Sequence, residues 1–167
     1  MNGEVGLQGA PRDLYADCYS RLVGIVAVAA ADRGTAEEVV QEAFLRLLPR
    51  WSQVSRYDDP EAWVRMVAFR LLSNRRRRAQ NKIRALVRTG SPPNGRPPSG
   101  DRVDVTRALA TLPMAQRQVI VLHHLLDLPL DQVATELGVA VGTVKSRLAR
   151  GRAALEPLLR EEANDHV

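Results

Sequence analysis

Apolar side chains recur every three or four residues in several stretches of this chain, which is the spacing of one face of a helix. Residues 13–31 carry one such repeat, and we expect them to form one long helix or two consecutive helices. A second repeat places five apolar side chains on one face, with charged and amide groups outward: Val39, Val40, Ala43, Leu47 and Leu48. No stretch alternates as a strand does and no internal repeat stands out, so the pattern predicts an all-α fold.

Polar residues mark the expected helix starts. Thr35 followed by Glu38 has the spacing of a capping box, so we expect the second helix to start there. Residues 51–59 are largely polar and predict a loop, and Asp59-Pro60 then offers a carboxylate cap and a proline for the first helical position. The helix that follows is predicted to bury Val64, Val67, Ala68, Leu71 and Leu72. Its flanking faces carry Trp63, Arg65, Phe69, Arg70 and Asn74.

The composition changes at residues 89–100, where the sequence TGSPPNGRPPSG holds four prolines and three glycines. A packed element is not expected from such a composition, which is typical of a linker. We therefore predict two small helical domains, residues 11–84 and 103–160, joined by a flexible linker at 85–102.

Residues 128–155, LPLDQVATELGVAVGTVKSRLARGRAAL, have the pattern of a helix-turn-helix unit. Helically spaced apolar residues stop at Gly138, which can adopt the left-handed conformation of a tight turn, and resume at Val141. The second helix has no acidic residue between 141 and 154 and carries Lys145, Arg147, Arg150 and Arg152. Its free amides and its basic side chains favour a polyanion, so we expect it to enter a DNA groove. The alternative is an ordinary helical hairpin with a solvated basic face.

The overall charge suits an anionic partner but does not establish one. Lys and Arg number 24 against 19 Asp and Glu in 167 residues, giving a net charge of +5 and an isoelectric point near 10.1. Only Lys82 and Lys145 are lysines, and a GC-rich genome also produces such an arginine bias. The positions of the basic residues must therefore decide whether the chain binds nucleic acid.

Cysteine use and hydropathy indicate a cytoplasmic protein. Cys18 is the only cysteine, which excludes a disulfide within the chain. The most apolar run, residues 22–31, is far shorter than the roughly 20 residues that span a bilayer. The N-terminus, MNGEVGLQGAPRD, lacks the basic start and apolar core of a signal peptide.

Four consecutive arginines, Arg75–Arg78, follow the helix that carries Trp63 and Phe69. Aromatic side chains stack on unpaired bases while arginines hold phosphates, so this pairing suits single-stranded DNA. The aromatics could equally belong to the core, and the arginines to a solvated helix end. The sequence pattern leaves both interpretations open.

Three stretches carry a resemblance to a known family: TAEEVVQEAFLRLLPRW at 35–51, LPMAQRQVIVL at 112–122 and LGVAVGTVKSRLARGRAAL at 137–155. In this order, and with the intervening linker, they resemble a bacterial sigma factor of the extracytoplasmic-function (ECF) type, which keeps only sigma regions 2 and 4. The resemblance covers nearly all of residues 14–159. It implies that the helix at 35–51 docks on the clamp of core RNA polymerase through Glu38, Gln41, Glu42, Phe44, Leu45 and Arg46.

The resemblance also implies two sites for promoter DNA. The minus-ten element would be melted and read, with a base flipped into a protein pocket, by a region that here includes Tyr57, Trp63, Arg70, Asn74, Arg75, Arg76 and Arg77. The minus-thirty-five element would lie in its major groove against the recognition helix. The residues that match there are Thr143, Lys145, Ser146, Arg147, Arg150 and His123.

The function implied is recruitment of core RNA polymerase to promoters, without catalysis and without a cofactor. The partners would be the polymerase, duplex promoter DNA and its melted non-template strand, and, as in many relatives, an anti-sigma protein; no small-molecule substrate is implied. A free-standing dimeric helix-turn-helix regulator is the alternative, and it would leave the pattern at 35–51 unexplained. A metal-dependent hydrolase using His123 and His124 lacks further ligands in the sequence, so no metal site is predicted.

Overall fold

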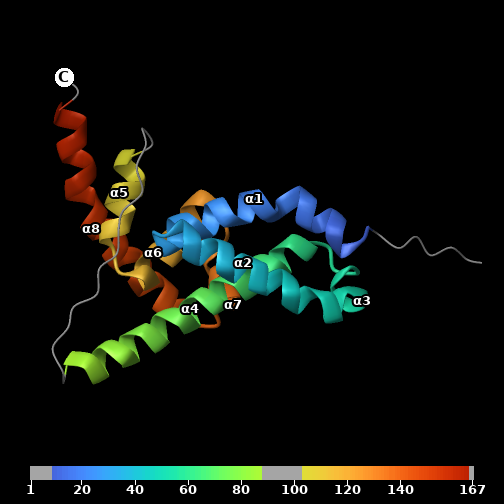
Figure 1. The fold of residues 1–167 in the computed structure, drawn as a ribbon. Helices are drawn as coiled ribbons and strands as arrows, with labels where there is room; N and C mark the ends of the chain where they lie inside the picture. Colours follow the sequence, from blue (N-terminus) through green and yellow to red (C-terminus); the bar gives the residue numbers. More distant parts are fainter. Residues whose placement is uncertain (1–8, 88–102, 166–167) are drawn as a thin grey trace, which may run out of the picture.

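The computed structural model describes residues 9–87 and 103–165, and within them all regular structure is helical. The N-terminal unit, residues 9–87, consists of α1 (Pro11–Ala30), α2 (Arg33–Leu47), the 3-10 turn η1 (Leu48–Arg50), α3 (Trp51–Val54) and α4 (Pro60–Val87). The C-terminal unit, residues 103–165, consists of α5 (Val103–Thr111), α6 (Met114–Ile120), the π-helical turn η2 (Val121–Leu125), α7 (Leu130–Leu137) and α8 (Val141–Asp165). Figure 1 shows α4 and α8 extending away from the packed middle of the molecule. The predicted all-α fold is confirmed.

Local chemistry explains where the helices of the N-terminal unit begin. Ala31 ends α1 in the left-handed conformation, and the carboxylate of Asp32 accepts a 2.9 Å hydrogen bond from the backbone amide of Thr35. Asp32 therefore caps α2. The predicted start at Thr35 was wrong, because Thr35 already lies inside the helix and its backbone amide donates to the Asp32 carboxylate. The predicted start of α4 is confirmed, since Asp59 accepts from the amide of Ala62 at 2.9 Å.

Some sequence predictions for the N-terminal unit need correction. The expected loop at 51–59 contains the short helix α3, and Val54 anchors it because its side chain is buried. Leu48 was placed in the core, but η1 turns it outward and it is 55% exposed. Phe69 was assigned to a flanking face and is fully buried. The proline-rich stretch 89–100 lies outside the described residues.

The helix-turn-helix prediction is confirmed in its geometry. Gly138 ends α7 with φ of +66°, in the left-handed region that glycine adopts at little cost. Val133 of α7 and Val144 of α8 are fully buried between the two helices, and Leu148 is nearly so. The turn thus fixes the angle at which α8 leaves the body of the protein.

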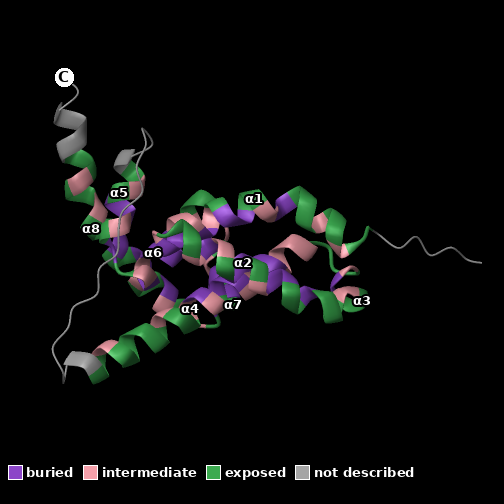
Figure 2. Cartoon of the chain, in the orientation of Figure 1, coloured by how far each residue is buried: buried purple, intermediate pink, exposed green. Residues whose placement is uncertain are grey.

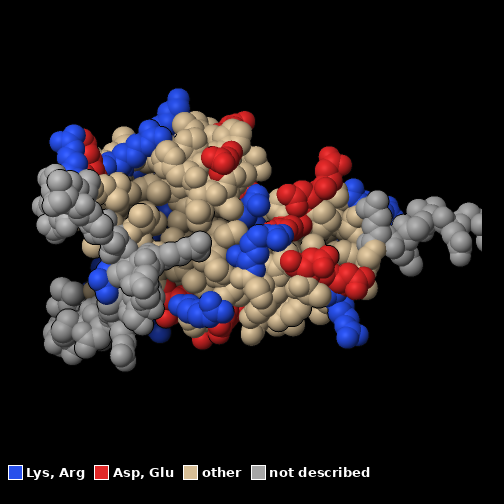
Figure 3. Space-filling model, turned by 90° about the horizontal axis from the view of Figure 1, so that it is seen from above, with Lys and Arg blue, Asp and Glu red and all other residues tan. Residues whose placement is uncertain are grey.

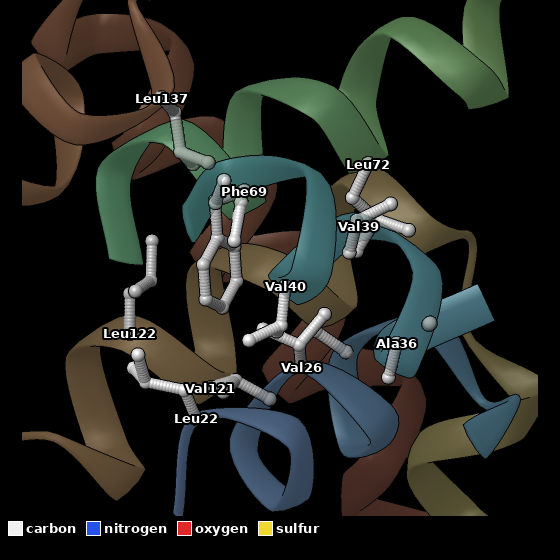
Figure 4. Packing of buried hydrophobic residues seen from close by; sticks show 14 of the residues in the cluster. Leu22, Val26, Ala36, Val39, Val40, Phe69, Leu72, Val121, Leu122 and Leu137 are labelled. Carbon is white, nitrogen blue, oxygen red and sulfur yellow. The ribbon is translucent and has the colours of Figure 1, made fainter. Parts of the chain in front are cut away.

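The two units share one hydrophobic core. Phe69 of α4 lies among side chains from both units, with Leu22 and Val40 from the N-terminal unit and Leu122 and Leu137 from the C-terminal unit (Figure 4). Buried residues accordingly gather where α1, α2, α4, α6 and α7 meet, while the far ends of α4 and α8 are largely exposed (Figure 2). The described structure is therefore a closed arrangement of two packed units.

Candidate nucleic-acid and partner interfaces

The first turns of α8 present the residues predicted to read duplex DNA. Lys145, Ser146 and Arg150 are exposed, whereas Thr143 and Arg147 are half-buried. The hydroxyl of Ser146 donates a 3.1 Å hydrogen bond to the carbonyl of Thr143, so this short side chain stays close to its own helix. The reach of this face therefore depends on its long basic side chains, which carry no acidic neighbour on the same stretch of helix.

His123 lies beside this helix rather than on it. The π-helical turn η2 aims its Nδ1 at the carbonyl of Leu128, 2.7 Å away, so Nδ1 carries the proton and the ring holds the loop before α7. The π-helical turn packs the rings of His123 and His124 edge to face, with their centres 4.8 Å apart. Arg152 of α8 donates to Nε2 of His124 at 3.1 Å. Burial, and then the charge of Arg152, lower the pKa of His124.

Metal ligands are not gathered at this histidine pair. Among the residues that the structure describes, no three His, Cys, Asp or Glu side chains are placed to hold one ion. The arginine contact also occupies Nε2, one of the two ring nitrogens of His124.

The second half of α4 is a basic arm, which we define as Arg75–Arg84. It contains four consecutive arginines, Lys82 and Arg84, and no acidic residue. Its base is tied down, because Arg75 forms an ion pair with Glu38 of α2 and Arg77 donates to Asn74. These contacts bring two residues predicted for the polymerase and for DNA, Glu38 and Arg75, into one pair.

Arg76 is the point at which the basic arm approaches the recognition helix. Its Nε is buried and has no hydrogen-bond partner among the described residues. Burial lowers the pKa of Arg76, and the charges of Arg147 and Arg77 lower it further. Arg76 of α4 and Arg147 of α8, predicted to contact different promoter elements, therefore lie close enough in this structure to repel each other.

Arg65 and Arg70 of α4 cross to α7. Arg65 and Glu136 are almost fully buried and form a two-pronged ion pair, with Nε of Arg65 3.0 Å from Oε2 of Glu136. Burial alone would lower the pKa of Arg65, and its hydrogen bonds to Glu136 and the charge of that carboxylate reverse this, so the pKa is raised. Arg65 had been assigned to a flanking face and is buried, because it pairs with a residue 71 positions away in the sequence.

Arg70 binds the carboxyl end of α7. Its Nε donates to the carbonyl of Glu136 at 3.1 Å, and its Nη2 donates to the carbonyl of Thr135 at 2.8 Å. The last carbonyls of a helix have no partner within the helix and carry partial negative charge, so an arginine is a favourable cap. Trp63, two residues before Arg65, is half-buried against the shared core, whereas Tyr57 is 41% exposed.

Two buried residues of α6 complete the contact between the units. Arg117 donates from Nε to the carbonyl of Ala29 at 2.7 Å and from Nη1 to those of Ala110 and Leu112, so one guanidinium caps the ends of both α1 and α5. Gln118 donates from Nε2 to the hydroxyl of Ser73 on α4 at 3.1 Å. Both residues belong to the LPMAQRQVIVL stretch, which the sequence marked without indicating that it faces the other unit.

A groove of about 380 Å³ lies between α2 and the start of α1. Tyr15 and Phe44 line it and pack edge to face at 4.9 Å, and Tyr15 also stacks on Tyr19 at 4.5 Å. Burial raises the pKa of Tyr15, and the charge and hydrogen bond of the neighbouring Tyr19 raise it further. The groove is lined by Pro11, Arg12, Tyr15, Gln41, Phe44, Leu45 and Leu48.

The groove unites part of the predicted polymerase-binding set and adds residues to it. Leu45 is 62% exposed at its edge, and Gln41 donates to the hydroxyl of Tyr19 at 3.2 Å. Glu42 and Arg46 pair with each other four residues apart along the same helix. Pro11, Arg12, Tyr15 and Leu48 were missed, and the helical spacing had placed Leu48 in the core.

Charge is unevenly distributed between the two ends of the molecule. In Figure 3, Asp and Glu side chains gather at the right, over the end where α1 begins and α3 lies, while Lys and Arg side chains form a row at the left, where the C-terminal unit lies. The acidic end thus carries the apolar groove, and the basic end carries the recognition helix.

Comparisons with known proteins identify the family. The model of Sigma-70 region 2 matches residues 14–82, and the model of Sigma-70 region 4 matches residues 102–155. The ECF RNA polymerase sigma factor SigL of Mycobacterium tuberculosis is 34% identical over 137 residues, which cover 78% of this chain and 77% of SigL. The chain belongs to the ECF RNA polymerase sigma factors. SigC of the same species is 31% identical over 131 residues, covering 75% of this sigma factor and 70% of SigC.

Solved structures share the fold of this sigma factor. The sigma factor RpoE of Bartonella quintana, crystallised with the anti-sigma factor NepR, matches with a TM-score of 0.70 at 20% identity, over 89% of this chain and 96% of that one. CnrH, solved in complex with the cytosolic domain of CnrY, matches with a TM-score of 0.55 at 24% identity, over 90% of this chain and 88% of that one. These likenesses confirm the all-α architecture.

Family membership confirms the function predicted from sequence. A sigma factor of regions 2 and 4 directs promoter-specific transcription initiation, and the dimeric regulator is not favoured. No helix in the described part of the chain combines the length and the apolar character needed to cross a membrane.

Proposed function

We propose that this sigma factor binds core RNA polymerase through the α1–α2 groove, reads the minus-ten element with α4 and reads the minus-thirty-five element with α8. Residues 11–84 would act as region 2, residues 103–160 as region 4, and residues 85–102 as the linker. The observation that carries this proposal is the groove, because a chain acting alone would not leave its leucines exposed beside the aromatic rings of Tyr15 and Phe44.

The groove suits one helix or helical pair of the polymerase clamp. Leu45 and Leu48 would pack against its apolar face, while Glu38, Gln41, Glu42 and Arg46 would form the polar rim. Phe44 would act from the floor, because it is only 7% exposed and supports Tyr15 from below.

The minus-ten site would be built on α4 and the loop before it. Tyr57 offers an exposed ring for an unpaired base, and Trp63 a half-buried one. Arg70, Asn74 and the arginines at the start of the basic arm, Arg75, Arg76 and Arg77, would hold the phosphates of the melted non-template strand.

The minus-thirty-five site would be the N-terminal half of α8 in the major groove. Lys145 and Arg147 would supply donors for guanine or for phosphate, Thr143 and Ser146 shorter polar contacts, and Arg150 a phosphate contact further along. His123 would act indirectly, since its ring already binds the loop before α7.

Chemistry in this complex belongs to the polymerase, so we assign the chain no catalytic residue, no cofactor and no metal. The protein would act in the cytoplasm, where the polymerase is found. An anti-sigma protein, the type of partner named with the related structure of RpoE, would compete for the same groove.

The promoter-reading half of the proposal is tested by reconstitution with sigma-free core polymerase and run-off transcription over a genomic promoter library. We expect transcripts from sites that share two spaced elements, and we expect the double variant Lys145→Ala, Arg147→Ala to lose them. Arg160→Ala is the matched control, because it removes an exposed arginine from the far end of the same helix. Equal transcription by both variants would contradict the assignment of α8.

The polymerase-binding half is tested at the groove. Leu45→Glu places a charge on the edge of the groove and should abolish co-elution with core polymerase. Val105→Glu is the control and should leave co-elution unchanged, because Val105 of α5 is similarly exposed, at 58%, but lies outside the groove. Unchanged co-elution of the Leu45 variant would move the polymerase site to another face.

A further inference from the structure

We propose that Arg65, Arg70 and Glu136 form a latch that holds the isolated sigma factor closed, and that Arg70 must release α7 before it can hold promoter DNA. The second part of this inference rests on the minus-ten site proposed above, and the first part does not. The latch is a conformational device of this chain, built from contacts between α4 and α7.

The ion pair of Arg65 and Glu136 gives the latch its specificity. Arg65 is 9% exposed and Glu136 is 5% exposed, and each satisfies the other with two hydrogen bonds. A buried ion pair adds little net stability over apolar packing, but it strongly disfavours any arrangement that leaves one charge buried alone. The pair therefore selects one docking register of α7 on α4.

Arg70 uses two of its five N–H donors to hold the end of α7. The Nε and Nη2 groups both bind carbonyls at the end of α7, at 3.1 and 2.8 Å. Gly138 lies beside this contact, since a Cβ built there would be 3.9 Å from the guanidinium, an ordinary van der Waals distance. While α7 holds the Nε–Nη2 edge of the guanidinium, a phosphate can bind that edge only by displacing the helix end.

The promoter geometry requires the latch to open. Elements centred 35 and 10 base pairs before the start lie about 25 base pairs apart, or roughly 85 Å at 3.4 Å per base pair. In the closed chain, Arg147 of the recognition helix lies close enough to Arg76 of α4 to lower its pKa. One closed molecule therefore cannot hold both elements, whereas residues 88–102 could separate the units by as much as about 50 Å if extended.

A fluorescence-transfer experiment on the full-length chain tests the latch without polymerase or DNA. Donor and acceptor dyes are attached through Arg33→Cys and Thr111→Cys, two exposed positions flanking the contact of Arg117 with Ala29. The native Cys18 does not compete, because its side chain is 1% exposed and burial raises its pKa to about 12. Urea is added stepwise, and far-UV circular dichroism follows helix content in the same samples.

We expect high transfer without urea, and loss of transfer before loss of helix content. Glu136→Gln and Arg65→Gln, which break the pair from opposite units, should each favour opening by roughly tenfold or more and shift the loss of transfer to lower urea. Glu156→Gln is the control, because it breaks an exposed ion pair with Arg160 on α8. Low transfer in the unmodified chain without urea would overturn the latch, as would one common urea midpoint for all four proteins.

A transcription assay on unlabelled protein then tests the release of Arg70. If opening must precede binding, the apparent affinity for polymerase rises with the open fraction, so Glu136→Gln should need about tenfold less protein for half-maximal transcript. An unchanged requirement would refute release as a step in initiation. If even the unmodified chain gave no transcript, the proposed function would fail, while the fluorescence result would still decide the latch.

Discussion

Replacing Gly151 by alanine tests the packing of the C-terminal unit. The change should lower the free energy of unfolding, whereas the same change at Gly24 should raise it. Gly151 lies within α8 and is buried against α6. A Cβ at this position would lie 2.6 Å from Cδ1 of Ile120 and 3.4 Å from its Cγ1, whereas real contacts are about 1 Å longer than the first of these. The missing side chain is therefore what lets α8 approach α6.

Two effects of known size oppose each other at Gly151. Alanine in a helix interior is favoured over glycine by about 1 kcal/mol. Forcing an extra carbon into a packed core costs about 1–3 kcal/mol, so we expect Gly151→Ala to lower the free energy of unfolding by roughly 1 kcal/mol. At Gly24 of α1 nothing lies within 4 Å of the added carbon, so Gly24→Ala should raise the free energy of unfolding by about 0.5–1 kcal/mol.

The assay is urea unfolding followed by far-UV circular dichroism, with Ile120→Val as the second arm of a double-mutant cycle. Ile120→Val removes the clashing Cδ1 and alone should cost about 1 kcal/mol. Combined with Gly151→Ala it should cost less than the sum of the two, with a coupling of about 1–2 kcal/mol. Additivity within about 0.5 kcal/mol, or a Gly151 variant as stable as the Gly24 variant, would refute the close approach of α6 and α8.

Three further outcomes follow from single side chains. Asp32→Ala should lower the free energy of unfolding by about 1 kcal/mol in urea titrations at neutral pH. Hydrogen bonds from Thr35 lower the pKa of Asp32, so this difference from the unmodified chain should vanish as the pH falls through that lowered pKa; a difference that persists in strong acid would contradict the cap. Gly138→Ala should cost about 1–2 kcal/mol in the same titration, since its φ is +66°, and no cost would argue against the left-handed turn. Cys18 has a pKa of about 12 against 9.0 for a free thiol, so native alkylation at pH 8 should be about a thousandfold slower than in urea, and equal rates would show that the thiol is exposed.

The sequence predicted the helices well because helix formation depends on residues three or four positions apart. The cap at Asp59, the turn at Gly138 and part of the buried faces of α2 and α4 could be inferred from such spacings. The start of α2 was misplaced by two residues because two capping patterns overlapped and the structure uses Asp32. The order of the three motif stretches was also enough to predict the family.

The candidate sites could be predicted only as residue types along each helix. Leu45 and Leu48 could be assigned to α2 or to the turn after it, but their groove exists only because α1 supplies the opposite wall. Likewise the residues expected to contact DNA stay predictions, because the closed chain shows their positions without DNA.

What the tertiary structure alone decided is the use of the arginines. Nothing in the local sequence distinguishes Arg65, Arg70 and Arg117 from the exposed arginines. Their hydrogen-bond partners lie in the other unit, 71, 66 and 88 residues away respectively. Local spacing determined where the helices of this chain form. Only the packing of the two units determined which charges are buried, because a guanidinium leaves water only where a distant carboxylate or helix end replaces its hydrogen bonds.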